Sequence, residues 1–412
     1  MIPEQATQAW IATMGPEAIA RSNGYFEGGY FLMLAGWAVT VVSCILLIWL
    51  KLLPRVRDGI EGRIKNGFVQ GAILVIAATI ALSILSFPLD LYAGFYREHQ
   101  FGLATQTLPA WLSEFAIGFG INLIISALFI SGLYQIVKRA PNTWWIWGAG
   151  VTGAFMALMI AIAPVFIAPL FNTYTPMEPG PLRDDIIAMA QANGVPANDV
   201  YVFDESRQSN RVTANVSGLF GTTRIALADN LLERVSPEGV RMVMAHEIGH
   251  YVLRHVVSIL VFTLFVVAIV FALLGTAMKR LIGDGRWGIR SVGDPAGLPL
   301  VIAVAATLFT LATPLFNNIT RFHEHQADIF GINASREPAG FAETALLLSE
   351  YRKMQPGPLE KWLFYTHPSG YDRIHMAMTW QAHEMEAGRY PQGPLGPREG
   401  YRPDFVVVDG GE

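Results

Sequence analysis

Six long apolar segments constrain the fold of this chain more than any other feature of its sequence. Each approaches or exceeds the roughly 20 apolar residues that an α-helix needs to cross a lipid bilayer. Only 15% of the 412 residues are charged and the mean hydropathy is +0.37, whereas soluble domains carry roughly 25% charged residues. The sequence therefore predicts a polytopic membrane protein whose spans lie at residues 31–50, 68–89, 115–137, 144–171, 256–278 and 297–319.

Charge and cysteine content exclude two other classes of protein. The 29 Lys and Arg residues against 33 Asp and Glu give a formal net charge of −4, and no nucleic-acid partner is expected without a basic surface. A single cysteine, Cys44, excludes a disulfide framework and a multi-cysteine metal site. Cys44 lies inside an apolar segment and is expected to be a small residue facing the core or the lipid.

The more polar sequence between the spans divides the chain into parts. No signal-peptide pattern precedes the first span, so that span is expected to be an anchor. The predicted parts are an N-terminal segment (1–30), four spans (31–171), a soluble insertion (172–255), two spans (256–320), a second polar, helical region (321–385) and a Gly/Pro-rich tail (386–412) that is expected to be loosely ordered.

The soluble insertion is expected to contain both helices and strands. A helix is predicted at 181–193, and short strands at 199–204, 211–217 and 224–229, around Gly218 and Gly221. A further helix begins at Ser236-Pro237-Glu238, where Ser is the N-cap, Pro occupies the first turn and Glu lies near the positive end of the helix dipole. This helix is predicted to carry residues 240–255.

The motif His246-Glu247-Ile248-Gly249-His250 lies on this last helix. Histidines four residues apart share one helical face, at the spacing that chelates one zinc ion. Glu247 is then near the open position of the metal, where it can take a proton from the attacking water. An accidental match would leave unpaired histidines on a buried helix, which is costly. The motif predicts one catalytic zinc ion per chain.

A catalytic zinc ion needs a third protein ligand besides the two histidines. The densest cluster of candidates is residues 321–328, directly after the sixth apolar segment. Glu324 and Asp328 are four residues apart, which suits Glu324 as a ligand and Asp328 as the hydrogen-bond acceptor of a ligating histidine. The spacing equally allows His323 or His325 to be the ligand, so it leaves the choice open.

At this point the chain resembles the type I CAAX prenyl proteases, integral-membrane zinc metalloproteases of the gluzincin group. That family pairs H-E-x-x-H with a downstream E-x-x-A-D after Ser-Arg or Thr-Arg, which here is residues 320–328. The resemblance runs from about residue 28 to 385 and includes 87–92, 100–102 and 168–176. It implies that Glu324 is the third ligand and that Asp328 is the hydrogen-bond partner of a ligating histidine. It also implies a mostly α-helical bundle of six spans that encloses a chamber, with a small α+β zinc metalloprotease domain.

Two further groups of site residues follow from the resemblance. His367 and Arg373 match a family His and Arg that face the scissile carbonyl, and a protonated histidine with an arginine suits stabilisation of an oxyanion. Without the family, Asp372-Arg373 would be interpreted as a surface turn. The family also has an edge strand that aligns an extended substrate through its main chain. The matching substrate-binding residues are Arg211, Thr213, Ala214 and Asn215.

This chain departs from the family at three places. Thr213 replaces the usual Asn of the edge strand, so a side-chain clamp by that Asn is not carried over. The chain has six predicted spans where the eukaryotic members have seven. The charged insertion of animal members is replaced by the short turn 233–238. The last two departures weaken any inference of specificity for prenylated CAAX substrates.

The distribution of positive charge predicts an orientation in the membrane. With six spans, both termini and the catalytic region lie on one side, where the short loops contain only Arg21 and Arg97. By the positive-inside rule the catalytic side is expected to face away from the cytoplasm. In the eukaryotic relatives it faces the cytosol, so the sequence leaves open which side of the membrane the active site faces. The other side has eleven Lys and Arg residues: 51, 55, 57, 63, 65, 138, 139, 279, 280, 286 and 290. Trp144, Trp145 and Trp147 are expected to form an interfacial belt.

The sequence thus predicts a zinc-dependent endopeptidase, integral to a bacterial inner membrane, that acts on peptides or proteins, including lipidated ones near their C-terminus. A first alternative is a quality-control protease of the same chemistry without lipid recognition. A second is a non-catalytic receptor or transporter with a residual zinc site. The almost uncharged span centres and the intact Glu247 disfavour this second alternative.

Overall fold

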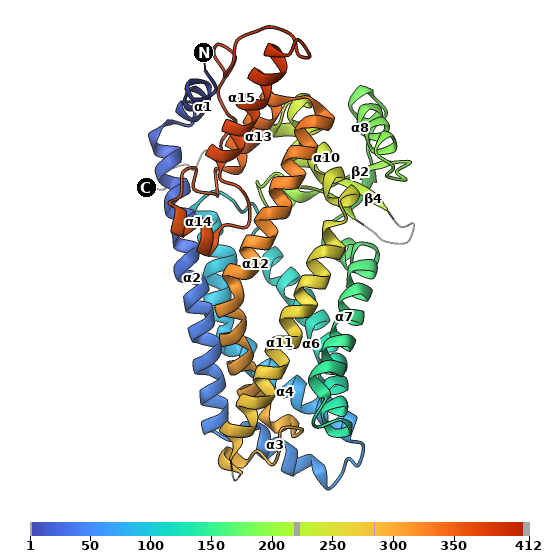
Figure 1. Ribbon diagram of the computed structural model, residues 1–412. Coiled ribbons are helices and arrows are strands. Elements are labelled where there is room, and N and C mark those ends of the chain that lie inside the picture. The colour runs from blue at the N-terminus through green and yellow to red at the C-terminus, as the bar shows by residue number, and fades with distance from the viewer. Residues whose placement is uncertain (1, 218–222, 284, 407–412) are drawn as a thin grey trace.

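The computed structural model describes residues 2–217, 223–283 and 285–406. Within these residues, six helical segments are long and apolar enough to cross a membrane, as predicted. They stand side by side in the lower part of an elongated molecule (Figure 1). The segments are α2 (Gly15–Trp49), α4 with α5 (Gly67–Leu91 and Arg97–Gln100, joined by a π-helical turn at Tyr92–Tyr96), α6 (Leu108–Arg139), α7 and two short turns after it (Trp144–Leu170), α11 (His255–Ile282) and α12 (Leu298–Ser335).

The remaining helices cap the two ends of this bundle. At the lower end lies α3 (Leu52–Glu61), which contains Arg55 and Arg57 (Figure 1). The other nine of the eleven basic residues are in the last turns of α6 and α11 and in the connections at the same end of the spans. The upper end carries α1 (Pro3–Ala12), α8 (Pro181–Ala192), α9 (Asp229–Arg234), α10 (Pro237–Val252), α13 (Pro338–Leu348), α14 (Pro358–Phe364) and α15 (Gly370–Glu386). The basic end of the bundle is therefore opposite to the end that contains the H-E-x-x-H helix.

The described strands form one four-stranded sheet in the order β1-β2-β4-β3. These are β1 (Tyr174–Pro176), β2 (Val200–Phe203), β3 (Ala214–Ser217) and β4 (Arg224–Ala228). The β2–β4 pair is parallel and the other two are antiparallel, so β3 is an edge strand. The strand expected at 211–217 begins only at Ala214, and β1 was not predicted. Gly218 and Gly221 lie outside the described residues.

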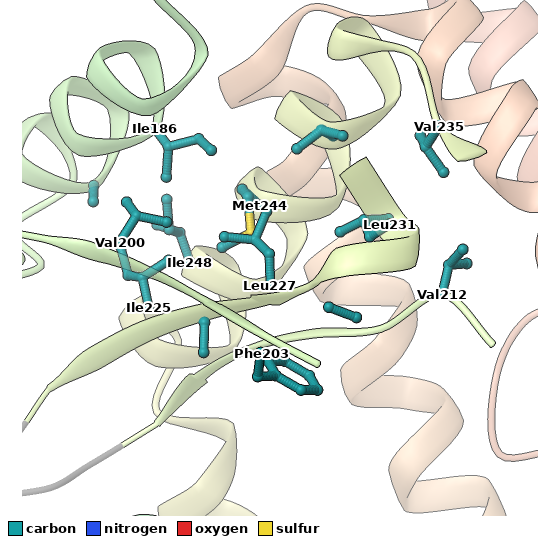
Figure 2. Close-up of a cluster of buried hydrophobic side chains, with 14 of the residues drawn as sticks. Ile186, Val200, Phe203, Val212, Ile225, Leu227, Leu231, Val235, Met244 and Ile248 are labelled. Atoms are coloured by element: carbon teal, nitrogen blue, oxygen red, sulfur yellow. The ribbon is translucent and has the colours of Figure 1, made fainter. Parts of the chain in front are cut away.

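The sheet packs against α8 and α10, and this packing orients the H-E-x-x-H motif. Figure 2 shows Ile186 of α8 and Met244 and Ile248 of α10 against the strand residues Val200 and Ile225. All five side chains are at most 1% exposed, and burying each contributes about 1.5–3 kcal/mol. Positions 246 and 250 lie about 200° around the helix from 244 and 248. The histidines therefore face away from the sheet.

Helix α12 continues without a break from the sixth span to Ser335 and packs against α10 (Figure 1). The two backbones meet at Gly331, where an added Cβ would lie 3.1 Å from the His246 nitrogen and 2.7 Å from Met242 Cε. Contacts this short exclude a larger residue without movement of the helices. Gly331 therefore permits α12 to place residues 324–328 directly opposite the histidines of α10.

Two local expectations differ from the structure. Residues 387–406 of the tail form no helix or strand, but they pack on the body, since Tyr401 contacts Trp10 edge-on at 4.9 Å and the Val406 N–H donates to Glu350. The expected belt is also incomplete. Trp144 is buried against Phe271, whereas Trp147 is 63% exposed. Both differences arise from contacts between segments that are distant in the sequence.

Candidate active site

Helices α10 and α12 bring His246, His250 and Glu324 together. One ligand-type atom from each residue lies within 4.8 Å of the other two. The two Nε2 atoms are 3.0 Å apart, and the Glu324 carboxylate lies 3.3 Å from His246 Nε2 and 3.6 Å from His250 Nε2. Of the three ligands that the spacing allowed, α12 thus presents Glu324 to the histidines, while His325 is exposed.

These three residues fit a zinc ion. Glu324 Oε2 is buried and makes no hydrogen bond. The guanidinium of Arg373 lies 3.9 Å from it but is paired more closely with Asp328, at 2.6 Å, so a further cation beside this oxygen would be favourable. Each Nδ1 atom faces another partner, so the two Nε2 atoms can direct their lone pairs at a common point. Two imidazoles and one carboxylate are the donor set of catalytic zinc sites, which keep a fourth position open.

The buried carboxylate of Asp328 supports this arrangement. Its carboxylate is fully buried and lies 2.9 Å from His246 Nδ1. The same carboxylate accepts two hydrogen bonds from Arg373, from Nε at 2.8 Å and from a terminal nitrogen at 2.6 Å. Asp328 therefore joins the first histidine of the motif to an arginine of α15, and it fixes the orientation of both.

His250 has a comparable support that the sequence did not predict. Its Nδ1 lies 2.9 Å from His255 Nδ1, and His255 Nε2 lies 3.2 Å from the Gln326 side-chain oxygen. Because that oxygen can only accept, His255 donates from Nε2 and accepts at Nδ1 from His250. The sequence signal that could have indicated this support was a histidine, His255, at the start of an apolar span. Helix α10 ends at Val252, and Arg254, with φ +55°, is the N-cap of α11, which begins at His255.

Glu247 lines a cavity of about 410 Å³ together with His246, Glu324 and Arg373. Burial raises the pKa of Glu247 to about 7, an effect that the nearby His246 and Arg373 oppose. A carboxylate with a raised pKa is a stronger base than an exposed glutamate. Glu247 is thus suited to accept a proton near neutral pH.

His367 and Arg373 both reach this cavity, although not in the form expected. His367 Nε2 lies 3.2 Å from Glu324 Oε2, and its Nδ1 lies 2.8 Å from the Thr366 hydroxyl. Burial lowers the pKa of His367 well below its usual value, with a further contribution from the charge of Arg352. A lowered pKa favours the neutral form of this imidazole, whereas the sequence suggested a protonated one. Arg373 directs two of its nitrogens at Asp328 and lies 3.9 Å from Glu324.

The predicted substrate-binding residues divide into two groups. Thr213 O accepts from Ala228 N on β4. By the antiparallel alternation, Thr213 and Asn215 pair with β4, while the main-chain groups of Ala214 and Val216 face the free edge of β3. Thr213 and Ala214 line the catalytic cavity.

Arg211 also lines the catalytic cavity, but its guanidinium is held 2.7 Å from Glu98 of the second span. Asn215 lines a second cavity of about 950 Å³, together with His250. Strand β3 therefore connects the two cavities.

Comparison with known proteins agrees with this geometry. Residues 176–381 match the model of peptidase family M48, and residues 9–173 match the family described as CAAX prenyl protease N-terminal, five membrane helices. In that second stretch the structure has four helices long and apolar enough to span a membrane. The protein named uncharacterized metalloprotease YhfN of Bacillus subtilis (strain 168) is 29% identical over 383 residues, which cover 91% of this chain and 90% of that protein.

Two further similarities concern yeast proteins. CAAX prenyl protease 1 of Saccharomyces cerevisiae is 28% identical over 311 residues, or 71% of this chain and 68% of that protein. The crystal structure of S. mikatae Ste24p has the same fold, with a TM-score of 0.73 and 22% sequence identity over 91% of this chain and 94% of that one. With these similarities, the six spans and the His-Glu cluster, the chain belongs to peptidase family M48 as an integral membrane metalloendopeptidase related to the CAAX prenyl proteases.

Proposed function

We propose that this protein is a zinc endopeptidase that hydrolyses a peptide bond in a substrate aligned along β3. The observation that supports this most strongly is the convergence of His246, His250 and Glu324 to within 4.8 Å. The same cavity contains the carboxylate of Glu247 and residues of the edge strand. Metal ligands, a base and a peptide-binding edge therefore meet at one place.

The chemistry follows from the positions of these groups. Zinc, when held by His246, His250 and Glu324, supplies a Lewis acid that polarises the scissile carbonyl and activates a water molecule. Glu247 takes the proton from the attacking water and returns it to the leaving amine. His367 Nε2–H, with Nδ1 accepting from Thr366, donates to the oxygen on which negative charge develops. Arg373 acts on the site through Asp328 and the orientation of His246.

The direction of the substrate follows from β-strand addition. A peptide that adds antiparallel to β3 pairs with the free main-chain groups of Ala214 and Val216. Its N-terminal side then lies toward Ser217 and the 950 Å³ cavity, and its C-terminal side toward Thr213. The larger cavity is lined by apolar residues of the fourth and fifth membrane-spanning helical segments, including Ile160, Ile167, Val256 and Val257. We therefore propose that this cavity takes an apolar group of the substrate, such as a prenyl chain.

Two experiments test this proposal with the purified full-length protein. Removing metal with a chelator should abolish peptide cleavage, and adding zinc back should restore it; cleavage that survives complete metal removal would contradict the proposed chemistry. A farnesylated peptide should then be cleaved faster than its unprenylated twin. Equal rates would contradict prenyl recognition and favour cleavage of membrane proteins without a lipid signal, with the same zinc chemistry.

A further inference from the structure

The 950 Å³ cavity beyond Ser217 has two chemically different parts, of which the first is apolar. Its wall is formed by Ile160 of α7 and by Val256 and Val257 of α11. On the side of α7 the wall continues along the π-helical turn Ala163–Ile167, where the regular helix is interrupted. The volume lies at the upper end of the range of about 300–1,000 Å³ that is typical of small-molecule sites. The cavity is therefore large enough for a ligand with a long apolar group.

The second part of the cavity carries positive charge. Arg224, the first residue of β4, and Arg254, which directly precedes α11, both line it. Among the described residues, no acidic side chain lines this cavity. Neither arginine makes an ion pair or a side-chain hydrogen bond within the part of the chain that the structure describes. The positive charge of the cavity is therefore not balanced by any described group of the protein.

The guanidinium of Arg224 is positioned to receive an anion. It lies over the ring of Tyr174, 4.0 Å from the ring centre, and a cation–π contact of this kind holds the group without using its N–H donors. Arg224 Nε is buried and makes no hydrogen bond, which is unfavourable until an acceptor is supplied. A phosphate group is a suitable acceptor, because it forms paired, charge-assisted hydrogen bonds with a guanidinium.

The position of this cavity relative to the membrane indicates that the phosphate belongs to a lipid. Arg254 directly precedes the fifth membrane-spanning segment, and β4 lies above the upper ends of α7 and α11 (Figure 1). The next residues, Val256 and Val257, are 42% and 49% exposed, so the apolar wall continues onto a surface that faces the acyl chains. Basic groups between spanning helices at the level of the headgroups are typical of sites for anionic lipids. The cationic and apolar parts thus match the headgroup and the chain of one phospholipid.

We propose that Arg224 and Arg254 bind the phosphate of an anionic phospholipid whose acyl chain occupies the apolar part of this cavity. His250 also lines the cavity, so the lipid lies beside the metal ligands. An apolar group of the substrate is proposed to enter the same cavity, and substrate and lipid therefore exclude one another. This exclusion rests on the proposed endopeptidase function, whereas binding of the lipid does not.

The first test measures lipid binding to the purified full-length protein in detergent micelles. A phosphatidylglycerol with a fluorescent acyl chain is displaced by unlabelled phosphatidylglycerol or by phosphatidylcholine with the same chains. The anionic lipid should bind about 25-fold more tightly, or about fivefold for each arginine. Arg224→Gln and Arg254→Gln should each reduce this ratio about fivefold, and the double variant should bind the two lipids equally.

Arg183→Gln is the matched control, because Arg183 is paired with Asp199 at 2.9 Å and lies outside this cavity. This variant should keep the ratio of the unmodified protein. Equal binding of the two lipids by the unmodified protein would overturn the proposal. A ratio that the double variant leaves unchanged would also overturn it, since the lipid would then bind elsewhere, such as at the basic end of the bundle.

A second test locates the acyl chain. Val257→Trp should fill the apolar part of the cavity and abolish saturable binding of phosphatidylglycerol. Leu273→Trp is its control, because Leu273 lies on the same helix and is 50% exposed but does not line the cavity. Glycerol 3-phosphate, which has the anion without the chain, should not displace the lipid. Unchanged binding in Val257→Trp, or displacement by glycerol 3-phosphate, would contradict a site for the whole phospholipid.

A third test separates lipid binding from the endopeptidase function. Saturating phosphatidylglycerol should raise the KM for a farnesylated peptide and leave kcat unchanged, and the double variant should lose this effect. Lipid binding without any change in KM would overturn the shared use of the cavity. Absence of cleavage in the unmodified protein would instead contradict the endopeptidase function, because the binding measurements need no turnover.

Discussion

Replacing Asp328 by asparagine tests the role of the carboxylate that joins His246 of α10 to Arg373 of α15. The Asp328 carboxylate is 0% exposed, accepts two hydrogen bonds from Arg373 and lies 2.9 Å from His246 Nδ1. Removing one member of a buried charge pair costs about 3–5 kcal/mol, because the other charge is left unpaired. Asparagine keeps the shape and one carbonyl oxygen. We therefore expect Asp328→Asn to lower the free energy of unfolding by about 3 kcal/mol.

The same substitution should weaken zinc binding. Loss of the partner that orients a ligating histidine reduces metal affinity by about 10- to 100-fold. Zinc affinity is measured by competition with a chelator, and stability by unfolding in detergent at one fixed zinc concentration. Glu384→Gln is a suitable control, because Glu384 also binds two arginines, Arg336 and Arg389, but lies outside the catalytic cavity. Zinc affinity within twofold of the unmodified protein in Asp328→Asn would refute the role assigned to this carboxylate.

Three further predictions follow from the contacts described above. His255→Ala should weaken zinc binding about tenfold, since it removes the acceptor that faces His250 Nδ1, and unchanged affinity by chelator competition would exclude this support. Val216→Pro should lower kcat/KM by removing a main-chain donor at the free edge of β3, while bound zinc stays unchanged; full activity would argue against strand addition. Burial, with a contribution from Asp229, raises the pKa of Glu205 from 4.5 to about 7. The free energy of unfolding therefore falls as the pH rises between these two pKa values, and it stays lower at higher pH. Glu205→Gln should therefore be more stable than the unmodified protein at pH 8 by about 2 kcal/mol, after allowance for partial exposure, and no more stable at pH 4.5; an equal difference at both pH values would contradict the titration.

The membrane architecture could be predicted because hydropathy is a local property. Each span is an apolar run whose length alone indicates a bilayer crossing. The start of α10 could also be predicted from neighbouring residues, because Ser236 caps the helix by accepting a hydrogen bond from Gly239 N at 3.2 Å. The three-residue strand β1 was not predicted, because its hydrogen bonds depend on β2, a partner about 25 residues away.

The choice among three neighbouring ligand candidates could not be made from spacing. His323, Glu324 and His325 occupy one turn, so only the rotation of α12 against α10 decides which of them faces the histidines. That rotation depends on the close approach at Gly331. His323 is instead directed at His255, with ring centres 4.6 Å apart. The family resemblance supplied the choice that the periodicity left open.

Other site residues were missed because they meet only in three dimensions. Gln326 and His255 are 71 positions apart in the sequence, and nothing in their local patterns links them.

The central claim is that this chain is a zinc endopeptidase with Glu247 as its base. The most direct measurement compares zinc content and peptide cleavage in the purified protein and in Glu247→Gln, prepared side by side. We expect one zinc ion per chain in both, with cleavage lower by about a thousandfold in the variant, because general acid–base catalysis contributes about 10²–10⁴-fold. Cleavage retained in Glu247→Gln with its zinc in place, or a protein that cleaves without binding zinc, would contradict the claim.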